Sequence, residues 1–334
     1  MVPGRWEAEL RYQRDTSLRS GAVIPVRSCG SPQLPLCLRS MLNVNDFGRR
    51  SKDRFGAGCT PFRYPGGKAF LTDFLEEQIV AAEGVTAYAE PYAGGAGAAI
   101  ELLARGTVDR IVLNDFDNRV HAAWWAMLHQ TNEFIDLVLS TPVNMDSWRR
   151  CQQLVVDNDR SGDKLALGFA TYFLNRTNHS GVILGAGPIG GHSQTGKWLI
   201  DARYYAETMV RRIRWLGDRK EDIALSNEDG LAFLKKFPAA YRDSTFFFID
   251  PPYVQAGAKL YLNAMSDLKH QDLAAYLTAT GNLKNWLVTY DDCQLIHDAY
   301  STAQVDKLAV RYSLRTKRTE HEVCVMPSQA ALLT

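Results

Sequence analysis

Short apolar runs alternate with helical patterns along much of this 334-residue chain. A run that reads as a strand begins at residue 87, and others lie at residues 110–114, 223–226, 246–249 and 286–290. Apolar positions at helical spacing follow most of these runs. Strands that are apolar on both faces and alternate with helices are typical of a parallel sheet covered by helices. The pattern therefore predicts an α/β fold.

Three parts of the chain depart from this alternation. Residues 1–58 show no sustained period, so we expect an irregular basic extension there, with Met41 as an alternative start. Residues 140–221 contain a helical run, a glycine-rich loop and a basic helical run. Residues 310–326 alternate as in a hairpin, which would add an antiparallel edge to the sheet.

Composition narrows the class of protein. Hydrophobic residues make up 46% and charged residues 22%, which is typical of globular proteins. Residues 146–220 carry twelve Lys and Arg against seven Asp and Glu, a candidate phosphate-contacting surface. The six cysteines form no C-x-x-C pair and no zinc spacing is present, so we expect reduced thiols, a cytoplasmic setting and no metal. No run of about eighteen apolar residues occurs, so no membrane span is expected.

The apolar run at 246–249 ends in Asp250, Pro251, Pro252 and Tyr253. Ligands of open α/β sheets bind beyond the carboxyl ends of strands, so these residues are expected over a site. The prolines fix the backbone and donate no N–H, which leaves nearby carbonyls free. A carboxylate, a carbonyl and a stacking ring suit a planar group with an exocyclic amine, whose lone pair would then face an electrophile. A simple Asp-Pro turn is the alternative.

Residues 87–97 read as a strand followed by a glycine turn, and an apolar helical pattern comes next. This is the layout of a nucleotide-binding βα unit. Gly94, Gly95 and Gly97 would let the backbone pass beneath a ligand without side-chain clashes. Asp115 follows the next strand, where an acidic side chain can bind both hydroxyls of a ribose. Together these features predict a nucleotide-containing cofactor.

Polar and basic residues gather after the helical run at 165–174. A glycine-rich loop at 182–197 and a basic run at 203–220 follow. Long glycine-rich loops are usually functional, and these side chains suit phosphate contacts and base-edge reading. A solvated charged helix beside a flexible loop is the alternative. Candidate nucleic-acid contacts are Asn175, Arg176, His179, Ser180, Lys197 and, in the predicted hairpin turn, Arg315, Lys317 and Arg318.

These motifs, in this order, closely resemble the Dam-type adenine-specific DNA methyltransferases over roughly residues 60–326. Residues 62–68 resemble the family's N-terminal motif, the turn after Glu90 its methionine-side cofactor loop, and residues 250–253 its catalytic motif. The Asn-Arg pair with Gly181 resembles the core of its target-recognition region. The cofactor contacts that the resemblance implies are Tyr64, Lys68, Glu90, Pro91, Gly94, Gly95, Gly97, Asp115, Asp229 and Asp250.

The resemblance implies a Rossmann-like class I methyltransferase sheet, mostly parallel with an antiparallel edge strand. Residues 59–139 and 222–334 would form the methyltransferase domain, and residues 140–221 an inserted, mainly helical target-recognition region. The implied enzyme uses S-adenosylmethionine, flips an adenine out of double-stranded DNA and methylates its N6 amine directly. It would act in a bacterial or phage-infected cytoplasm as a monomer, with a weak dimer as the alternative, inside or outside a restriction-modification system.

Some alternatives stay open at this stage. GATC-reading members carry aromatic, glycine and arginine residues after Asn-Arg, whereas this chain offers His179 at most as an intercalating ring, so the target sequence is not given. Cytosine N4, an RNA base or a glutamine side chain are alternative acceptors, and a non-catalytic nucleic-acid-binding relative is another. The chain has no Pro-Cys dipeptide, so it lacks the thiol nucleophile of carbon-5 cytosine methyltransferases.

Overall fold

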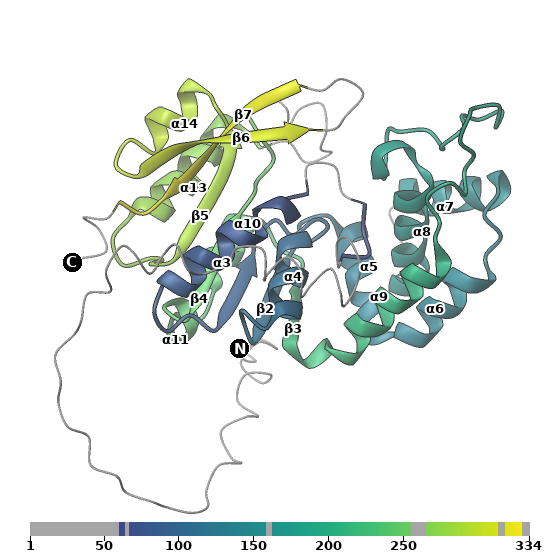
Figure 1. Cartoon of the computed structure of the whole chain (residues 1–334), viewed down its shortest axis with the longest axis horizontal. Coiled ribbons are helices and arrows are strands. Elements are labelled where there is room, and N and C mark those ends of the chain that lie inside the picture. Colours follow the sequence, from purple (N-terminus) through teal and green to yellow (C-terminus); the bar gives the residue numbers. More distant parts are fainter. Residues whose placement is uncertain (1–59, 64–66, 158–161, 255–264, 313–317, 329–334) are drawn as a thin grey trace, which may run out of the picture. The chain divides into compact units, whose positions relative to one another are not determined.

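The computed structural model describes residues 60–63, 67–157, 162–254, 265–312 and 318–328. The extension predicted at residues 1–58 lies outside these ranges. Within them, seven strands form a sheet in the order β3-β2-β1-β4-β5-β7-β6 (Figure 1). The strands are β1 (Ala87–Glu90), β2 (Arg110–Asn114), β3 (Ile223–Ser226), β4 (Thr245–Ile249), β5 (Trp286–Asp291), β6 (Gln304–Tyr312) and β7 (Arg318–Met326).

Strand pairing separates a parallel body from an antiparallel edge. β1 pairs in parallel with β2 and β4, β2 with β3, and β4 with β5. β7 pairs antiparallel with β5 and β6. The predicted mostly parallel sheet with an antiparallel edge is therefore confirmed. Successive strands are added on one side of β1 and then, from β4, on the other, so a ligand crevice is expected between the carboxyl ends of these two strands.

Burial explains why these short runs form strands. All five residues of β4 are buried. The Tyr88 ring of β1 stacks on the rings of Phe246 and Phe248, with centroids 6.4 Å away in each case. Side chains that are apolar on both faces of a strand avoid water only when helices cover both faces of the sheet. The helices beside the sheet are η2 (Ala69–Leu71), α3 (Thr72–Ala81), α4 (Gly97–Arg105), α10 (Gly230–Lys236), α11 (Ala239–Arg242), α13 (Asp267–Thr278) and α14 (Gln294–Ala299).

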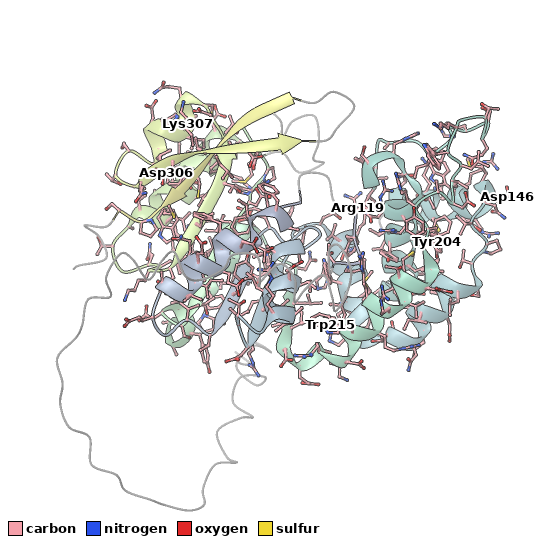
Figure 2. The ribbon with its side chains drawn as sticks, viewed as in Figure 1. Arg119, Asp146, Tyr204, Trp215, Asp306 and Lys307 are labelled. Atoms are coloured by element: carbon pink, nitrogen blue, oxygen red, sulfur yellow. The ribbon has the colours of Figure 1, made fainter. Side chains whose placement is uncertain are left out.

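A second group of helices packs around α8. This helix contacts α5, α6 and α7, while α9 contacts α5 and α6 (Figure 1). Gly168 allows α8 to approach α5 closely, because a Cβ there would lie 2.5 Å from the carbonyl oxygen of Ala122. Tyr204, labelled in Figure 2, lies with its ring 5.6 Å from that of Phe173. The group comprises α5 (Asn118–His129), α6 (Thr131–Ser140), α7 (Met145–Asp157), α8 (Lys164–Thr177) and α9 (Ala206–Asp218), with η3 (His179–Gly181) and η4 (Lys220–Asp222).

The helical group includes α5 and α6, which precede residue 140, and α5 also packs against β3. The division at residues 139 and 221 stays a prediction. Among the described helices, none combines the length and apolar character that a membrane crossing requires. The described residues also contain no group of three or more His, Cys, Asp or Glu that could hold a metal ion.

Candidate active site

A cavity of about 680 Å³ opens where β1 and β4 end. Its size lies within the range of about 300–1,000 Å³ that is usual for small-molecule sites. Its walls come from the segment before η2, the turns after β1, β2 and β4, and the start of α10. The predicted site residues that line it are Lys68, Glu90, Gly94, Gly95, Gly97, Asp115, Asp229, Asp250 and Pro252.

Three side chains hold the carboxylate of Asp250, the first residue after β4. The hydroxyls of Thr289 and Tyr253 donate to Oδ1 at 2.6 and 3.2 Å. Nζ of Lys68 lies 3.1 Å from the same oxygen and 3.9 Å from Oε1 of Glu322. Lys68 is only 6% exposed. The buried ammonium thus offsets the negative charge of Asp250, which lines the cavity, and of the nearby Glu322.

The turn that follows Asp250 is tied to β5. The backbone N–H of Val254 donates to Oδ1 of Asp291 at 3.0 Å. Thr289 and Asp291 are two residues apart on one strand, so both ties come from the same face of β5. Pro251 is buried, and the Lys68 ammonium lies 5.0 Å from the centroid of the Tyr253 ring. The aromatic ring is therefore placed beside the carboxylate, as the sequence predicted for neighbours on one stiff turn.

The glycine turn between β1 and α4 is held from two sides. Oδ2 of Asp115 accepts from the Gly94 N–H at 2.8 Å, and the Trp124 indole donates to the Gly94 carbonyl at 2.9 Å. Ala96 has a φ of 44°, a left-handed conformation that non-glycine residues adopt mostly at functional or tightly determined sites. Burial raises the pKa of Asp115 to about 6, although its hydrogen bonds from the backbone oppose the shift. This carboxylate both fixes the turn and lines the cavity.

Glu90, the last residue of β1, is an acidic group that the protein encloses almost completely. Its Oε1 accepts from the Tyr88 hydroxyl at 3.1 Å and from the Ala99 N–H at 3.3 Å. Burial and, to a smaller extent, the negative charge of Asp250 together raise the pKa of Glu90 to about 8, although the hydrogen bonds from Tyr88 and Ala99 oppose the shift. Glu90 is 5% exposed, and Pro91 beside it is buried. A neutral Glu90 is therefore the resting state below pH 8.

Asp229 and Gly230 form the wall at the start of α10. Oδ1 of Asp229 accepts from the first turn of the helix, and Oδ2 lies 3.2 Å from Nζ of Lys269. Partial burial opposes ionisation, but these hydrogen bonds and the ammonium lower the pKa of Asp229. A Cβ on Gly230 would lie 2.3 Å from the ring of Tyr92, which also lines the cavity. The glycine is therefore required for this ring position.

Asn175 and Arg176 lie buried at the end of α8, where they are 0% and 5% exposed. The Asn175 amide donates to the carbonyls of Arg63 and Gly181 at 2.7 and 2.8 Å. Nε and Nη2 of Arg176 donate to the carbonyl of Arg203 at 3.1 and 2.6 Å. Both side chains thus organise the main chain of segments distant in sequence.

Three of the other predicted nucleic-acid contacts, His179, Ser180 and Lys197, have exposed side chains. His179 and Ser180 are exposed in η3. Lys197 is exposed, with Nζ 5.8 Å from the ring centroid of Trp198, which is itself 63% exposed. Arg318 is the first residue of β7, whereas Tyr64, Arg315 and Lys317 lie outside the described residues.

Several side chains at the site were not indicated by the sequence. Thr289 and Trp124 belong to runs that read as an ordinary strand and an ordinary core helix, and spacing does not reveal their hydrogen bonds. Tyr92 and Phe116 also line the cavity, and Phe116 is 57% exposed. Tyr92 directly follows Pro91, and Phe116 directly follows Asp115. Their position next to predicted site residues was the only feature of the sequence that could have indicated them.

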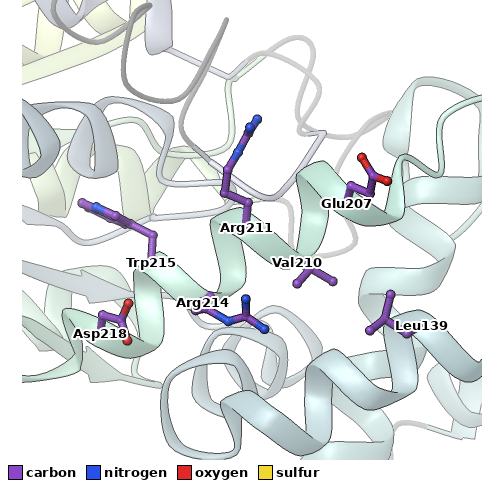
Figure 3. Close-up of a pocket in the computed structure, with 7 residues that line it drawn as sticks. All are labelled: Leu139, Glu207, Val210, Arg211, Arg214, Trp215 and Asp218. Carbon is purple, nitrogen blue, oxygen red and sulfur yellow. The ribbon is translucent and has the colours of Figure 1, made fainter.

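A second hollow of about 490 Å³ lies on α9 beside the end of α6 (Figure 3). Leu139, Val210 and Trp215 form its apolar part. Its charged rim has two arginines and two acidic residues, so it has no net charge to select a partner. The lining shares no residue with the first cavity, and we assign no function to it. The rim residues are Glu207, Arg211, Arg214 and Asp218.

Comparison with known proteins agrees with this geometry. The model of the D12 class N6 adenine-specific DNA methyltransferase family matches residues 64–314, which is more than half of the chain. The comparison with curated proteins found no match. Both residues 250–253 and the glycine turn at 94–97 fall inside the matched range. The chain therefore belongs to the D12 class of N6 adenine-specific DNA methyltransferases, the activity that its sequence motifs predicted.

Proposed function

We propose that S-adenosylmethionine binds in the cavity between β1 and β4, and that the residues from Asp250 to Tyr253 hold the target adenine at its edge. One observation carries this proposal: Asp250 and the glycine turn at 94–97 line the same cavity. A methyl donor bound at the glycine turn and an amine bound at the Asp250 carboxylate would therefore lie in the same cavity.

The chemistry of the cavity wall suits the parts of this cofactor. Asp115 is placed for the ribose hydroxyls, and Glu90 is an acidic group for the ammonium of the methionine part. The exposed ring of Phe116 offers a flat apolar surface to the adenine ring. When bound, the cofactor supplies an electrophilic methyl group on its sulfonium sulfur. Tyr64, Lys68, Pro91 and Asp229 remain further candidate contacts.

In the proposed reaction the side chains of this enzyme orient the acceptor. Asp250 accepts one hydrogen of the adenine amine, the Pro251 carbonyl accepts the other, and Tyr253 stacks on the base. Held in this way, the amine would turn its lone pair toward the methyl group that the cofactor supplies; a C–N bond would form as the C–S bond breaks, the bonding pair would stay on sulfur, and the nitrogen would release one proton to solvent. Alignment and fixed charges supply most of the acceleration.

DNA contact is proposed for the exposed residues of segment 197–205. Trp198 and Tyr205 are 63% and 53% exposed, and Lys197 and Arg203 are exposed cations. Aromatic rings and cations together suit bases and phosphates. The buried Arg176 fixes this segment through the Arg203 carbonyl, so we propose that Asn175 and Arg176 act as positioning residues. His179, Ser180, Arg315, Lys317 and Arg318 stay candidate contacts.

The loop at 182–197 is proposed to set the target sequence. Gln194 holds this loop together, because its amide donates to the carbonyls of Ile189 and Gly191 and accepts from the Ile200 N–H. Replacing the loop with that of another family member should change the methylated sequence and leave cofactor affinity unchanged. An unchanged target would contradict this assignment. Residues 140–221 are proposed to form the target-recognition region of a monomeric cytoplasmic enzyme from a bacterium or phage.

The direct test uses a host without DNA methylation. DNA from cells that express the full chain is sequenced with modified bases identified directly, and the Asp250→Ala variant serves as the comparison. We expect N6-methyladenine at one recurring sequence with the wild type and none with Asp250→Ala. The variant should still bind the cofactor with nearly unchanged affinity. Full methylation by Asp250→Ala would remove this carboxylate from the mechanism.

A further inference from the structure

We infer that Thr289 is a positioning residue that selects which oxygen of Asp250 receives the adenine amine. The inference rests on the proposed role of Asp250. Its starting point is the short hydrogen bond from Oγ1 of Thr289 to Oδ1 of Asp250, 2.6 Å long. Nothing in the catalytic motif itself supplies this bond, because the donor comes from the neighbouring strand.

The sheet places these two residues opposite each other. β4 and β5 are parallel neighbours in which Phe248 pairs with Leu287 and Ile249 with Val288. The next step of the same register brings Asp250 beside Thr289. Thr289 is fully buried, and its strand also holds the Val254 end of the turn through Asp291. A β-branched side chain on a buried strand is stiff, so the hydroxyl is a fixed donor.

The donors around Asp250 are arranged unequally between its two oxygens. Thr289, Tyr253 and Lys68 all approach Oδ1. Among the described residues, no hydrogen bond or ion pair to Oδ2 is formed. A carboxylate whose Oδ1 is fixed in this way has its plane fixed, which leaves Oδ2 as the oxygen to accept from an amine in the cavity that Asp250 lines. Thr289 is the neutral, fully buried member of the three, so it sets the orientation without adding charge.

Loss of this hydroxyl should affect transfer more than binding. Without Thr289 only the longer contacts from Tyr253 and Lys68 hold Oδ1, so the carboxylate is less firmly oriented and a bound adenine amine spends less time in the aligned geometry. We expect Thr289→Val in the full chain to lower the single-turnover methylation rate about ten- to a hundredfold, the range for one hydrogen bond to a charged group. Cofactor Kd should stay within about twofold. Thr289→Ser, which keeps the hydroxyl, should restore most of the rate.

The test measures single-turnover transfer of labelled methyl to DNA, cofactor Kd by calorimetry, and thermal unfolding for each variant. Thr245→Val is the matched control, since Thr245 is also fully buried and donates to a carbonyl, that of Tyr241, at the opposite end of β4. It should keep the wild-type rate. If Thr289→Val does not fold, Thr289→Ala replaces it in the comparison with Thr289→Ser.

Three results would overturn the inference: a wild-type rate in Thr289→Val, an equal loss in Thr289→Ser, or a loss of cofactor affinity as large as the loss of rate. Failure of the proposed function looks different, because a fully active Asp250→Ala or an absence of N6-methyladenine with the wild type would appear without any change at Thr289.

Discussion

Asn175 holds the main chain of Arg63 from both sides. Its Oδ1 accepts from the Arg63 N–H at 2.9 Å, and its Nδ2 donates to the Arg63 carbonyl at 2.7 Å. The same amide donates to Gly181, so one buried side chain joins the segment that leads to Lys68 with the start of the loop after α8. A bond pattern of this kind replaces a strand pairing, because it satisfies both polar groups of one residue.

Replacing Asn175 with Ala should therefore destabilise the protein. The change leaves two carbonyls and one N–H in a buried place without their partner, at a cost of about 1–3 kcal/mol in the free energy of unfolding. Chemical denaturation measures this cost. Asn285→Ala is the control, since Asn285 is only partly buried and its side chain makes a single, exposed hydrogen bond to the Asp243 carbonyl. Equal stability of the two variants would show that the Asn175 bonds contribute little.

Lys68→Met should weaken both cofactor binding and methyl transfer. The ammonium lies 3.1 Å from Asp250, which lines the cavity, and 3.9 Å from Glu322, so its removal takes away a charge that offsets both acidic groups. We expect cofactor binding to lose about 1–3 kcal/mol, as for a lost hydrogen bond to a charged group. Calorimetry with the cofactor and single-turnover assays measure the two effects. Lys236→Met, whose ammonium pairs with Glu228 on the surface, should change neither. Unchanged binding and transfer in Lys68→Met would exclude this role.

Much of the sheet could be predicted because most of its strands are short, continuous apolar runs in the sequence. The runs at 110–114 and 223–226 have the same bounds as β2 and β3. Residues 246–249 lack only Thr245 of β4. The hairpin was placed too late: β6 begins at Gln304, because residues 304–309 pair with β7 despite their mixed polar pattern. Pairing with an existing edge overrode the local signal there.

The contacts that complete the site could not be predicted in the same way. Thr289 meets Asp250 across a strand pair separated by 39 residues, and Asn175 meets Arg63 across 112. The first of these bonds depends on the register between β4 and β5, and the second on how α8 packs. Neither feature produces a recognisable residue spacing in the sequence. The proposed catalytic motif at 250–253 and the glycine turn could be recognised because each is continuous in the chain and lies at a strand end.

Gly230→Ala should lower cofactor affinity through Tyr92. The new Cβ would lie 2.3 Å from the Tyr92 ring, and the ring has to move because the backbone of α10 cannot. Since Tyr92 lines the cavity, we expect about tenfold or more loss in affinity, comparable to other overpacking costs of about 1–3 kcal/mol. Adding Tyr92→Ala should relieve the clash and make the Gly230 change nearly neutral. Additive effects of the two substitutions would argue against this contact. Gly187→Ala, which meets only His192 at 3.7 Å, is the control.

Glu90 predicts a pH dependence of cofactor binding with a definite sign. Its pKa is raised from 4.5 to about 8, so the free protein carries a proton there at pH 6 or 7. Pairing with the ammonium of the cofactor requires the ionised form, which means that binding must release this proton. Each pH unit below 8 then costs up to about tenfold in affinity. Affinity should therefore rise from pH 6 to 8.

Glu90→Gln separates this effect from the titration of the cofactor itself. The amide keeps the shape of the side chain and cannot ionise, so affinity of the variant should vary with pH only as the cofactor ammonium does. Calorimetry of the wild type at pH 7 in buffers of different ionisation enthalpy should show close to one proton released, and the variant close to none. Proton uptake by the wild type, or equal release by both proteins, would mean that Glu90 stays neutral in the complex. In that case the raised pKa of Glu90 would reflect only its burial at the end of β1. The ammonium of the cofactor would then have to be bound by another acidic group of the cavity wall.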